Sequence, residues 1–86
     1  DYLATEADIA AYLNAAFEDG DTSVIAAALR DVARAKGETQ LAKETGITRD
    51  GLYKALSPTG NPSFDTVQKI LRAFGLKLDV APSAQI

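Results

Sequence analysis

The sequence predicts an all-α fold of five short helices, followed by one short β-strand. Apolar residues recur every three or four positions in successive segments, and glycine or proline interrupts the pattern between the segments. Beyond Gly75 the pattern changes, because apolar and charged residues alternate there as they do in a half-buried strand. With 86 residues, of which 47% are apolar and 24% charged, the chain is expected to form one small globular domain.

The first two helices are expected on either side of Gly20. Thr5 can cap the first helix, whose apolar stripe comprises Ile9, Tyr12, Leu13, Ala16 and Phe17. Asp21 or Thr22 can cap the second helix, which Gly37 ends. The buried stripe of the second helix is expected to comprise Ile25, Ala28, Leu29, Val32 and Ala35.

Residues 38–56 fit a helix-turn-helix motif. A third helix is expected over residues 38–45, and a fourth runs from its N-cap, Thr48, to about Leu56. Gly46 supplies the positive φ that the turn between them needs. The small and apolar residues that should face inward have the spacing of the motif: Ala42, Ile47, Leu52, Ala55 and Leu56. The alternative interpretation is a plain helical hairpin in a small bundle.

A fifth helix follows the loop SPTGNP at residues 57–62. Asn61 or Ser63 can cap it, and Gly75 is expected to be its C-cap. Its buried face is predicted to comprise Phe64, Val67, Ile70, Leu71 and Phe74.

The alternating residues after Gly75 are the candidate dimerisation contacts. Leu76, Leu78 and Val80 share one face of the predicted strand. One strand needs a partner strand, so we favour pairing between two copies in a homodimer. The alternative is an extended tail that lies on the helices.

The outer face of the fourth helix is the candidate DNA-reading surface, because the N-terminal residues of such a helix usually meet base edges. The fork of Arg49 suits guanine, whereas Asp50 either accepts from cytosine, holds Arg49 or caps the helix. Gly51 either allows close approach to DNA or is merely tolerated at a cost of about 1 kcal/mol. Each of these side chains could equally be an ordinary solvated one. The candidate DNA contacts are Thr48, Arg49, Asp50, Gly51, Tyr53 and Lys54, with Gln40 and Lys43 before them and Ser57 and Asn61 after them.

Charge divides the chain unevenly. Residues 1–21 hold six acidic residues and no basic one, which makes them −6, whereas residues 22–86 are +3 and the whole chain is −3. The division predicts an acidic helical arm (1–21), a helix-turn-helix domain (22–75, motif 38–56) and a C-terminal strand and tail (76–86). Such asymmetry indicates separate partners for the two parts, unless the acidic residues serve only for solubility.

Several classes of function are disfavoured by composition. The chain has no His and no Cys, and it lacks a phosphate-cradling glycine loop and a cluster with metal-ligand spacing. We therefore expect no enzyme activity, no metal and no cofactor. The absence of Cys fits a cytoplasmic protein, and no apolar run approaches the ~20 residues of a membrane span. No signal peptide is visible, and because the chain has no Met, its natural N-terminus is expected to be missing.

Four segments carry a resemblance to a known family: DIAAYLNAAFEDGD (8–21), ARAKG (33–37), TGITRDGLYKALSPTGNP (45–62) and TVQKILRAFGLKL (66–78). The chain resembles the Cro/C1-type helix-turn-helix domain and, more narrowly, the HigA-like addiction-module antidote proteins of bacterial type II toxin–antitoxin operons. One departure from the broader pattern concerns Gln40. Cro/C1 domains usually place two more residues between the Thr-Gln pair and the Leu-Ala pair, so Gln40 is a weaker phosphate contact here.

The resemblance implies an antitoxin that neutralises a small basic toxin of the RelE/HigB-like kind. It also implies a homodimer that binds double-stranded operator DNA and represses its own operon. The acidic arm would then meet the basic toxin through Asp8, Glu18, Asp19 and Asp21. Two alternatives stay open: a transcriptional regulator unrelated to a toxin, and a toxin-masking protein that does not bind DNA.

Overall fold

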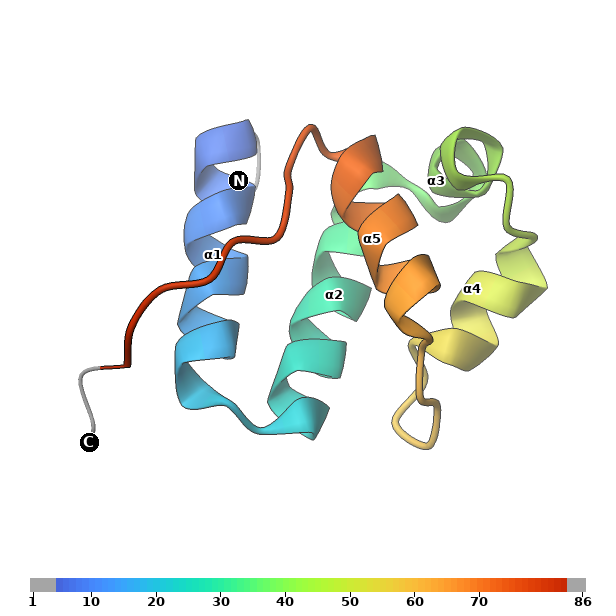
Figure 1. Cartoon of the computed structure of the whole chain (residues 1–86). Helices are drawn as coiled ribbons and strands as arrows, with labels where there is room; N and C mark the ends of the chain where they lie inside the picture. Colours follow the sequence, from blue (N-terminus) through green and yellow to red (C-terminus); the bar gives the residue numbers. More distant parts are fainter. Residues whose placement is uncertain (1–4, 84–86) are drawn as a thin grey trace.

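The all-α class is confirmed by the structure, a computed structural model that describes residues 5–83. Figure 1 shows the helices of this part of the chain: α1 (Glu6–Asp19), α2 (Thr22–Lys36), α3 (Glu38–Thr45), α4 (Arg49–Ala55) and α5 (Phe64–Ala73). Asp1 of the predicted acidic arm and residues 84–86 of the predicted tail lie outside the described residues.

Local chemistry sets the helix ends. Side-chain oxygens of Thr5, Asp21, Thr48 and Ser63 accept hydrogen bonds from backbone N–H groups in the first turns of α1, α2, α4 and α5. Asp21 rather than Thr22, and Ser63 rather than Asn61, is therefore the cap where the sequence left two candidates.

The C-terminal end of α5 differs by one residue from the prediction. Phe74 is the C-cap, and Gly75 follows it with a φ of 75°. The N–H of Leu76 donates to the carbonyl of Leu71, and that of Gly75 donates to the carbonyl of Arg72, both at 2.9 Å. This pattern is a Schellman motif, which needs the left-handed residue just after the cap.

The core lies where α3 meets α2, α4 and α5. Its most completely buried large side chains are Leu29, Val32, Leu41 and Ile70. The predicted stripes are right for most positions and wrong for three, one of which is Phe17 of α1, which is 37% exposed. Phe64 is the first residue of α5 and is 69% exposed, so the covered face of α5 starts a turn later. Ala35 is also exposed. Ala26 and Ala33 are buried although they lie outside the predicted stripe, because α2 packs against both α1 and α3 and therefore buries more than one stripe.

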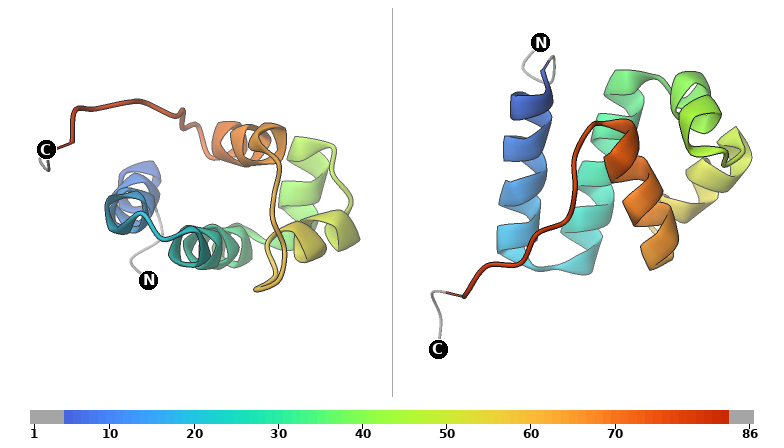
Figure 2. Two further views of the ribbon diagram at one scale, coloured as in Figure 1. Left: turned by 60° about the horizontal axis from the view of Figure 1, so that its bottom comes forward. Right: turned by 45° about the horizontal axis from the view of Figure 1, so that its top comes forward.

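The predicted acidic arm packs on its own domain. Leu13 and Ala16 of α1 are buried and join the core cluster, and α2 is the helix that α1 contacts within residues 5–83. Figures 1 and 2 show α1 beside α2 at one end of the molecule, with α3 and α4 at the other. The molecule is elongated, with principal extents of 40 × 28 × 20 Å.

The predicted C-terminal strand is not found, because residues 76–83 are extended chain with no partner strand in the described residues. This segment crosses α1 (Figures 1 and 2), which is the alternative that the sequence left open. Leu76 and Leu78 are half-buried against the core, whereas Val80 is 93% exposed. A strand requires a hydrogen-bonding partner, so pairing between two copies stays a prediction. Within residues 5–83, no helix has both the length and the apolar character needed to cross a membrane.

Candidate functional site

A tight turn fixes the orientation of α4 relative to α3. Gly46 has a φ of 75°, a left-handed conformation that side chains other than glycine rarely adopt. The hydroxyl of Thr45 donates to the carbonyl of Leu41 at 2.8 Å and accepts from the N–H of Ile47 at 3.2 Å. Ile47 then packs against the core as a half-buried residue. The Thr45 hydrogen bonds and the packing of Ile47 therefore fix the turn on either side of Gly46, before α4 begins.

The inner and outer faces of α4 differ sharply. Leu52 is buried, and Leu56 just after the helix is buried as well. The outer face presents Arg49, Asp50, Tyr53 and Lys54, all exposed. The structure therefore brings four of the predicted DNA contacts together on one surface of one helix.

Carboxylates accompany both cations of this face. Arg49 lies 4.0 Å from Glu38, and Lys54 lies 3.2 Å from Asp50. Of the roles considered for Asp50, the structure shows pairing, with Lys54 rather than with Arg49. Exposed pairs such as these contribute little stability, typically about 0–1 kcal/mol, so both cations can exchange their partners for a phosphate or a base at small cost.

Thr48 and Gly51 have a shared structural role at the start of α4. The Thr48 hydroxyl oxygen accepts from the Gly51 N–H at 2.9 Å. A Cβ at position 51 would lie 3.0 Å from that oxygen and 3.2 Å from Ile47 Cγ2. Gly51 therefore sits over the turn, and close packing there gives a reason for glycine that the sequence did not suggest.

The two candidates on α3 have different surroundings. The side-chain amide of Gln40 donates to Glu44 at 2.7 Å, and Lys36 pairs with Glu44 at 3.1 Å. The Gln40 hydrogen bond, followed by that of Lys36, lowers the pKa of Glu44, because both stabilise the charged carboxylate. Lys43 is exposed and forms no ion pair within residues 5–83. The Gln40 side chain is therefore engaged within its own helix, and Lys43 is the more accessible of the two predicted phosphate contacts.

The two candidates beyond α4 lie in the loop that leads to α5. The Ser57 hydroxyl donates to the Lys54 carbonyl at 2.9 Å and so closes the end of α4. Asn61 is exposed in the same loop. Both lie at the C-terminal end of α4, away from Arg49 and Asp50 in its first turn.

Arg30 of α2 is a positioning residue for α4 that sequence reasoning missed. Its guanidinium donates to the carbonyl of Leu56 at the end of α4, across 26 positions of sequence. A charged donor at this end also complements the negative pole of the helix dipole. The available signal was a single arginine directly after the buried Leu29, in an otherwise apolar stretch of α2.

Replacing Arg30 with alanine is expected to loosen the end of α4 and to lower the free energy of unfolding by about 1.5–3 kcal/mol, the usual loss for a hydrogen bond to a charged group. Hydrogen exchange of the Leu56 amide, together with urea unfolding, measures both effects. Arg34→Ala is the matched control, because Arg34 is exposed one turn further along α2. Equal effects of the two changes would contradict the role given to Arg30.

The four predicted acidic contacts do not form one cluster. Asp8 is half-buried near the start of α1, and Glu18 faces a shallow hollow between α1 and the tail. Asp19 and Asp21 lie at the α1–α2 connection. Asp21 is the cap of α2, where the Ser23 hydroxyl, followed by the Ser23 N–H, lowers the pKa of its carboxyl group.

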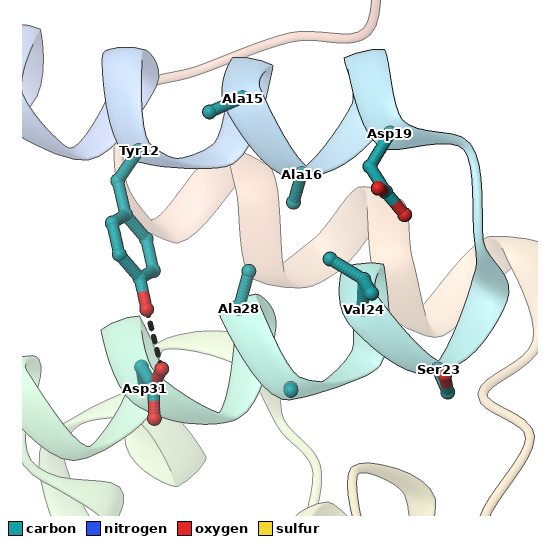
Figure 3. A pocket seen from close by; sticks show the side chains of 9 residues that line it. Tyr12, Ala15, Ala16, Asp19, Ser23, Val24, Ala28 and Asp31 are labelled. Atoms are coloured by element: carbon teal, nitrogen blue, oxygen red, sulfur yellow. Dashed lines mark hydrogen bonds between the residues drawn. The ribbon is translucent and has the colours of Figure 1, made fainter.

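A second hollow lies between α1 and α2 and has a volume of about 510 Å³ (Figure 3). Alanines line much of it, and Val24 projects into it from α2. Asp19 stands at one end. At the other end the Tyr12 hydroxyl donates to Asp31 at 2.5 Å, which joins α1 to α2. The sequence indicated the acidic character of this region but not that two helices would enclose it.

These features define a class of protein: a small all-α domain with a mixed-charge helix face at one end and an acidic, partly apolar surface at the other. Within residues 5–83, no cluster of acidic side chains has the geometry of a metal site. A family described as "Probable addiction module antidote protein" matches residues 1–82. The chain belongs to this family of antidote proteins, that is, of antitoxins, and membership implies a toxin partner.

A relative supports the same assignment. An uncharacterized protein of Haemophilus influenzae is 45% identical over 83 residues, which cover 96% of this chain and 86% of the relative. No solved structure matches the chain. The antitoxin kind expected from the sequence is thereby confirmed.

Proposed function

We propose that this antitoxin neutralises a small basic toxin of the RelE/HigB-like kind and, as a homodimer, binds its own operator DNA to repress its operon. The observation that carries the DNA-binding half is the exposed face of α4, which follows a glycine turn and presents Arg49, Tyr53 and Lys54 outward. A helix presented in this way can enter the major groove of DNA. The α3–α4 pair is then a helix-turn-helix of the Cro/C1 type.

Each α4 residue has a distinct role in this proposal. Arg49, in the first turn, reads a guanine through two parallel hydrogen bonds. Lys54 and Tyr53, one turn further on, contact a base or a phosphate, and Lys43 of α3 contacts a phosphate. In a homodimer, two such helices would read half-sites about 34 Å apart.

The separation of the two surfaces supports binding of DNA and toxin at the same time. α4 lies at one end of the molecule and α1 at the other, and the long axis measures 40 Å (Figure 1). The α4 face would meet DNA through Arg49 and Lys54, once they exchange their carboxylate partners for the DNA, while the acidic face at the other end meets a basic toxin. We propose that the protein works by binding in the cytoplasm and has no catalytic activity.

Arg49→Ala is expected to weaken binding to DNA from just upstream of the gene by roughly 10- to 100-fold, since a bidentate contact to guanine contributes about 1–3 kcal/mol. Fluorescence anisotropy at two salt concentrations measures the affinity, which should fall steeply with salt. Lys77→Ala is the matched control, because it removes one exposed positive charge from the C-terminal segment, away from α4. Equal affinities of both variants would contradict reading by α4.

A toxin-masking protein without DNA binding is the second candidate. It is favoured by the pairing of Arg49 with Glu38 and of Lys54 with Asp50, which leaves the α4 face close to neutral. In that case wild-type protein would not bind the upstream DNA at either salt concentration. The neighbouring reading frame distinguishes the main proposal from a transcriptional regulator that has no toxin. It should encode a short basic protein if the main proposal is right.

A further inference from the structure

The hollow between α1 and α2 combines three properties that a binding surface for a helix needs. Its floor contains small side chains, among them Ala15, Ala16, Ala27 and Ala28, which allow another backbone to approach closely. Val24 is 40% exposed, although it lies beside buried residues of α2. Two carboxylates flank this apolar strip, and no basic side chain from residues 5–83 lines it.

The carboxylates keep capacity for further bonds. Asp19 accepts from the Asp21 N–H at 3.3 Å, and Asp31 accepts from the Tyr12 hydroxyl. An ionised carboxylate offers about four lone-pair sites, so these contacts leave room for a cation at each. Both groups therefore hold their positions while remaining able to pair with an incoming Lys or Arg.

The negative charge of Asp19 and Asp31 determines which kind of partner can bind in the hollow between α1 and α2. DNA carries phosphates, which both aspartates would repel. A second copy that docked through the same surface would bring the Asp19 and Asp31 carboxylates of both copies into one interface, because a twofold interface joins the same patch of each copy. A basic protein partner is the occupant that this surface fits, and membership in the antidote family supplies a protein partner, the toxin.

We infer that this hollow is the docking site for one amphipathic, basic helix of the toxin. The inference deepens the proposed function and rests on its toxin-binding half. Tyr12, which holds Asp31, and Asp19 are seven residues apart on α1, which corresponds to roughly 10 Å along a helix. A toxin helix lying along the hollow would meet both carboxylates with basic residues about two turns apart, and its small or apolar residues would face Val24.

Binding of the small basic protein encoded beside this gene tests the inference. The toxin is recovered from the co-expressed pair by denaturation and refolding, and its affinity for each antitoxin variant is measured by isothermal titration calorimetry. Val24→Lys places a cation in the hollow, and Asp31→Asn removes a charge while keeping an oxygen that can accept from Tyr12. Asp79→Asn is the matched control, since Asp79 is also an exposed carboxylate but lies in the C-terminal segment, at the other hollow.

The inference predicts that Val24→Lys and Asp31→Asn each weaken binding by roughly 30-fold or more. Val24→Lys sets a cation against the basic residues of the toxin, and Asp31→Asn removes one partner of an interfacial charge pair. Asp79→Asn should change the affinity by less than about threefold, as expected for a charge outside the interface. Thermal unfolding by circular dichroism checks that each variant is folded. Exposed Val24 tolerates lysine because lysine is a good helix former.

Two other outcomes would distinguish failure of the proposed docking site from failure of the proposed toxin neutralisation. If wild-type protein binds the toxin but all three variants bind equally, or Asp79→Asn is the most impaired, the hollow is not the docking site and the proposed neutralisation stands. If wild-type protein does not bind this toxin at all, the toxin-binding half of the proposed function fails, and the inference fails with it.

Discussion

Leu41→Ala is expected to lower the free energy of unfolding by about 2–5 kcal/mol, the range for removing a fully buried leucine side chain. Leu41 is 0% exposed and belongs to α3, the helix that contacts α2, α4 and α5. A domain of this size has a total stability of only about 4–13 kcal/mol. The substitution therefore removes a large part of the stability and loosens the support of α4. Urea unfolding at 25 °C, followed by circular dichroism, measures the loss.

Phe64→Ala is the control for this experiment. It removes a larger side chain, but Phe64 is 69% exposed, so a loss of less than about 1 kcal/mol is expected. A loss at Phe64 as large as that at Leu41 would contradict the arrangement of α5 against the core.

Gly60→Ala is expected to destabilise the protein by about 1–3 kcal/mol and to shift the end of α4. A Cβ at position 60 would lie 2.2 Å from the carbonyl oxygen of Lys54 and 2.5 Å from that of Ala55. Both obstacles are backbone atoms in the last turn of α4, which cannot rotate away as a side chain would. Either the loop or the end of α4 must move.

Two measurements report this movement: urea unfolding and affinity for the upstream DNA. Under the proposed function, the affinity should fall even though Gly60 itself is not a predicted DNA contact, because Tyr53 and Lys54 lie on the displaced turn. Thr59→Ala is the control for the unfolding measurement, since Thr59 is exposed in the same loop. Unchanged unfolding and unchanged amide spectra of α4 in Gly60→Ala would rule out the close contact.

The candidate DNA-reading face was predictable from the sequence because it depends on local relationships. Thr48 caps α4 through Gly51, three positions away, and Gly46 makes the turn by its own backbone conformation. Once α4 is recognised, helical periodicity places Arg49 and Lys54 away from Leu52. The partners of these cations were not predictable, because the position of Glu38 beside Arg49 depends on how α3 and α4 are packed.

The arrangement of the C-terminal segment could not be predicted from local sequence patterns. Alternation of Leu76 and Leu78 with charged residues suits a strand, but it suits equally an extended chain whose leucines rest on helices. The structure shows the second arrangement for the single chain, with Leu76 and Leu78 against the core. Period-two patterns report which side of an extended chain is covered and not what covers it.

By itself, the sequence determined the helical class, the helix caps Thr5 and Thr48, the turn at Gly46 and most of the buried positions, because each depends on residues within a few positions of one another. Only the tertiary structure decided that α1 packs on α2, that Arg30 holds the end of α4 and that Tyr12 joins Asp31 across the acidic hollow. These contacts span 26 positions for Arg30 and Leu56 and 19 for Tyr12 and Asp31. Side chains so far apart in the sequence meet only after the helices have packed, so no local pattern encodes their pairing.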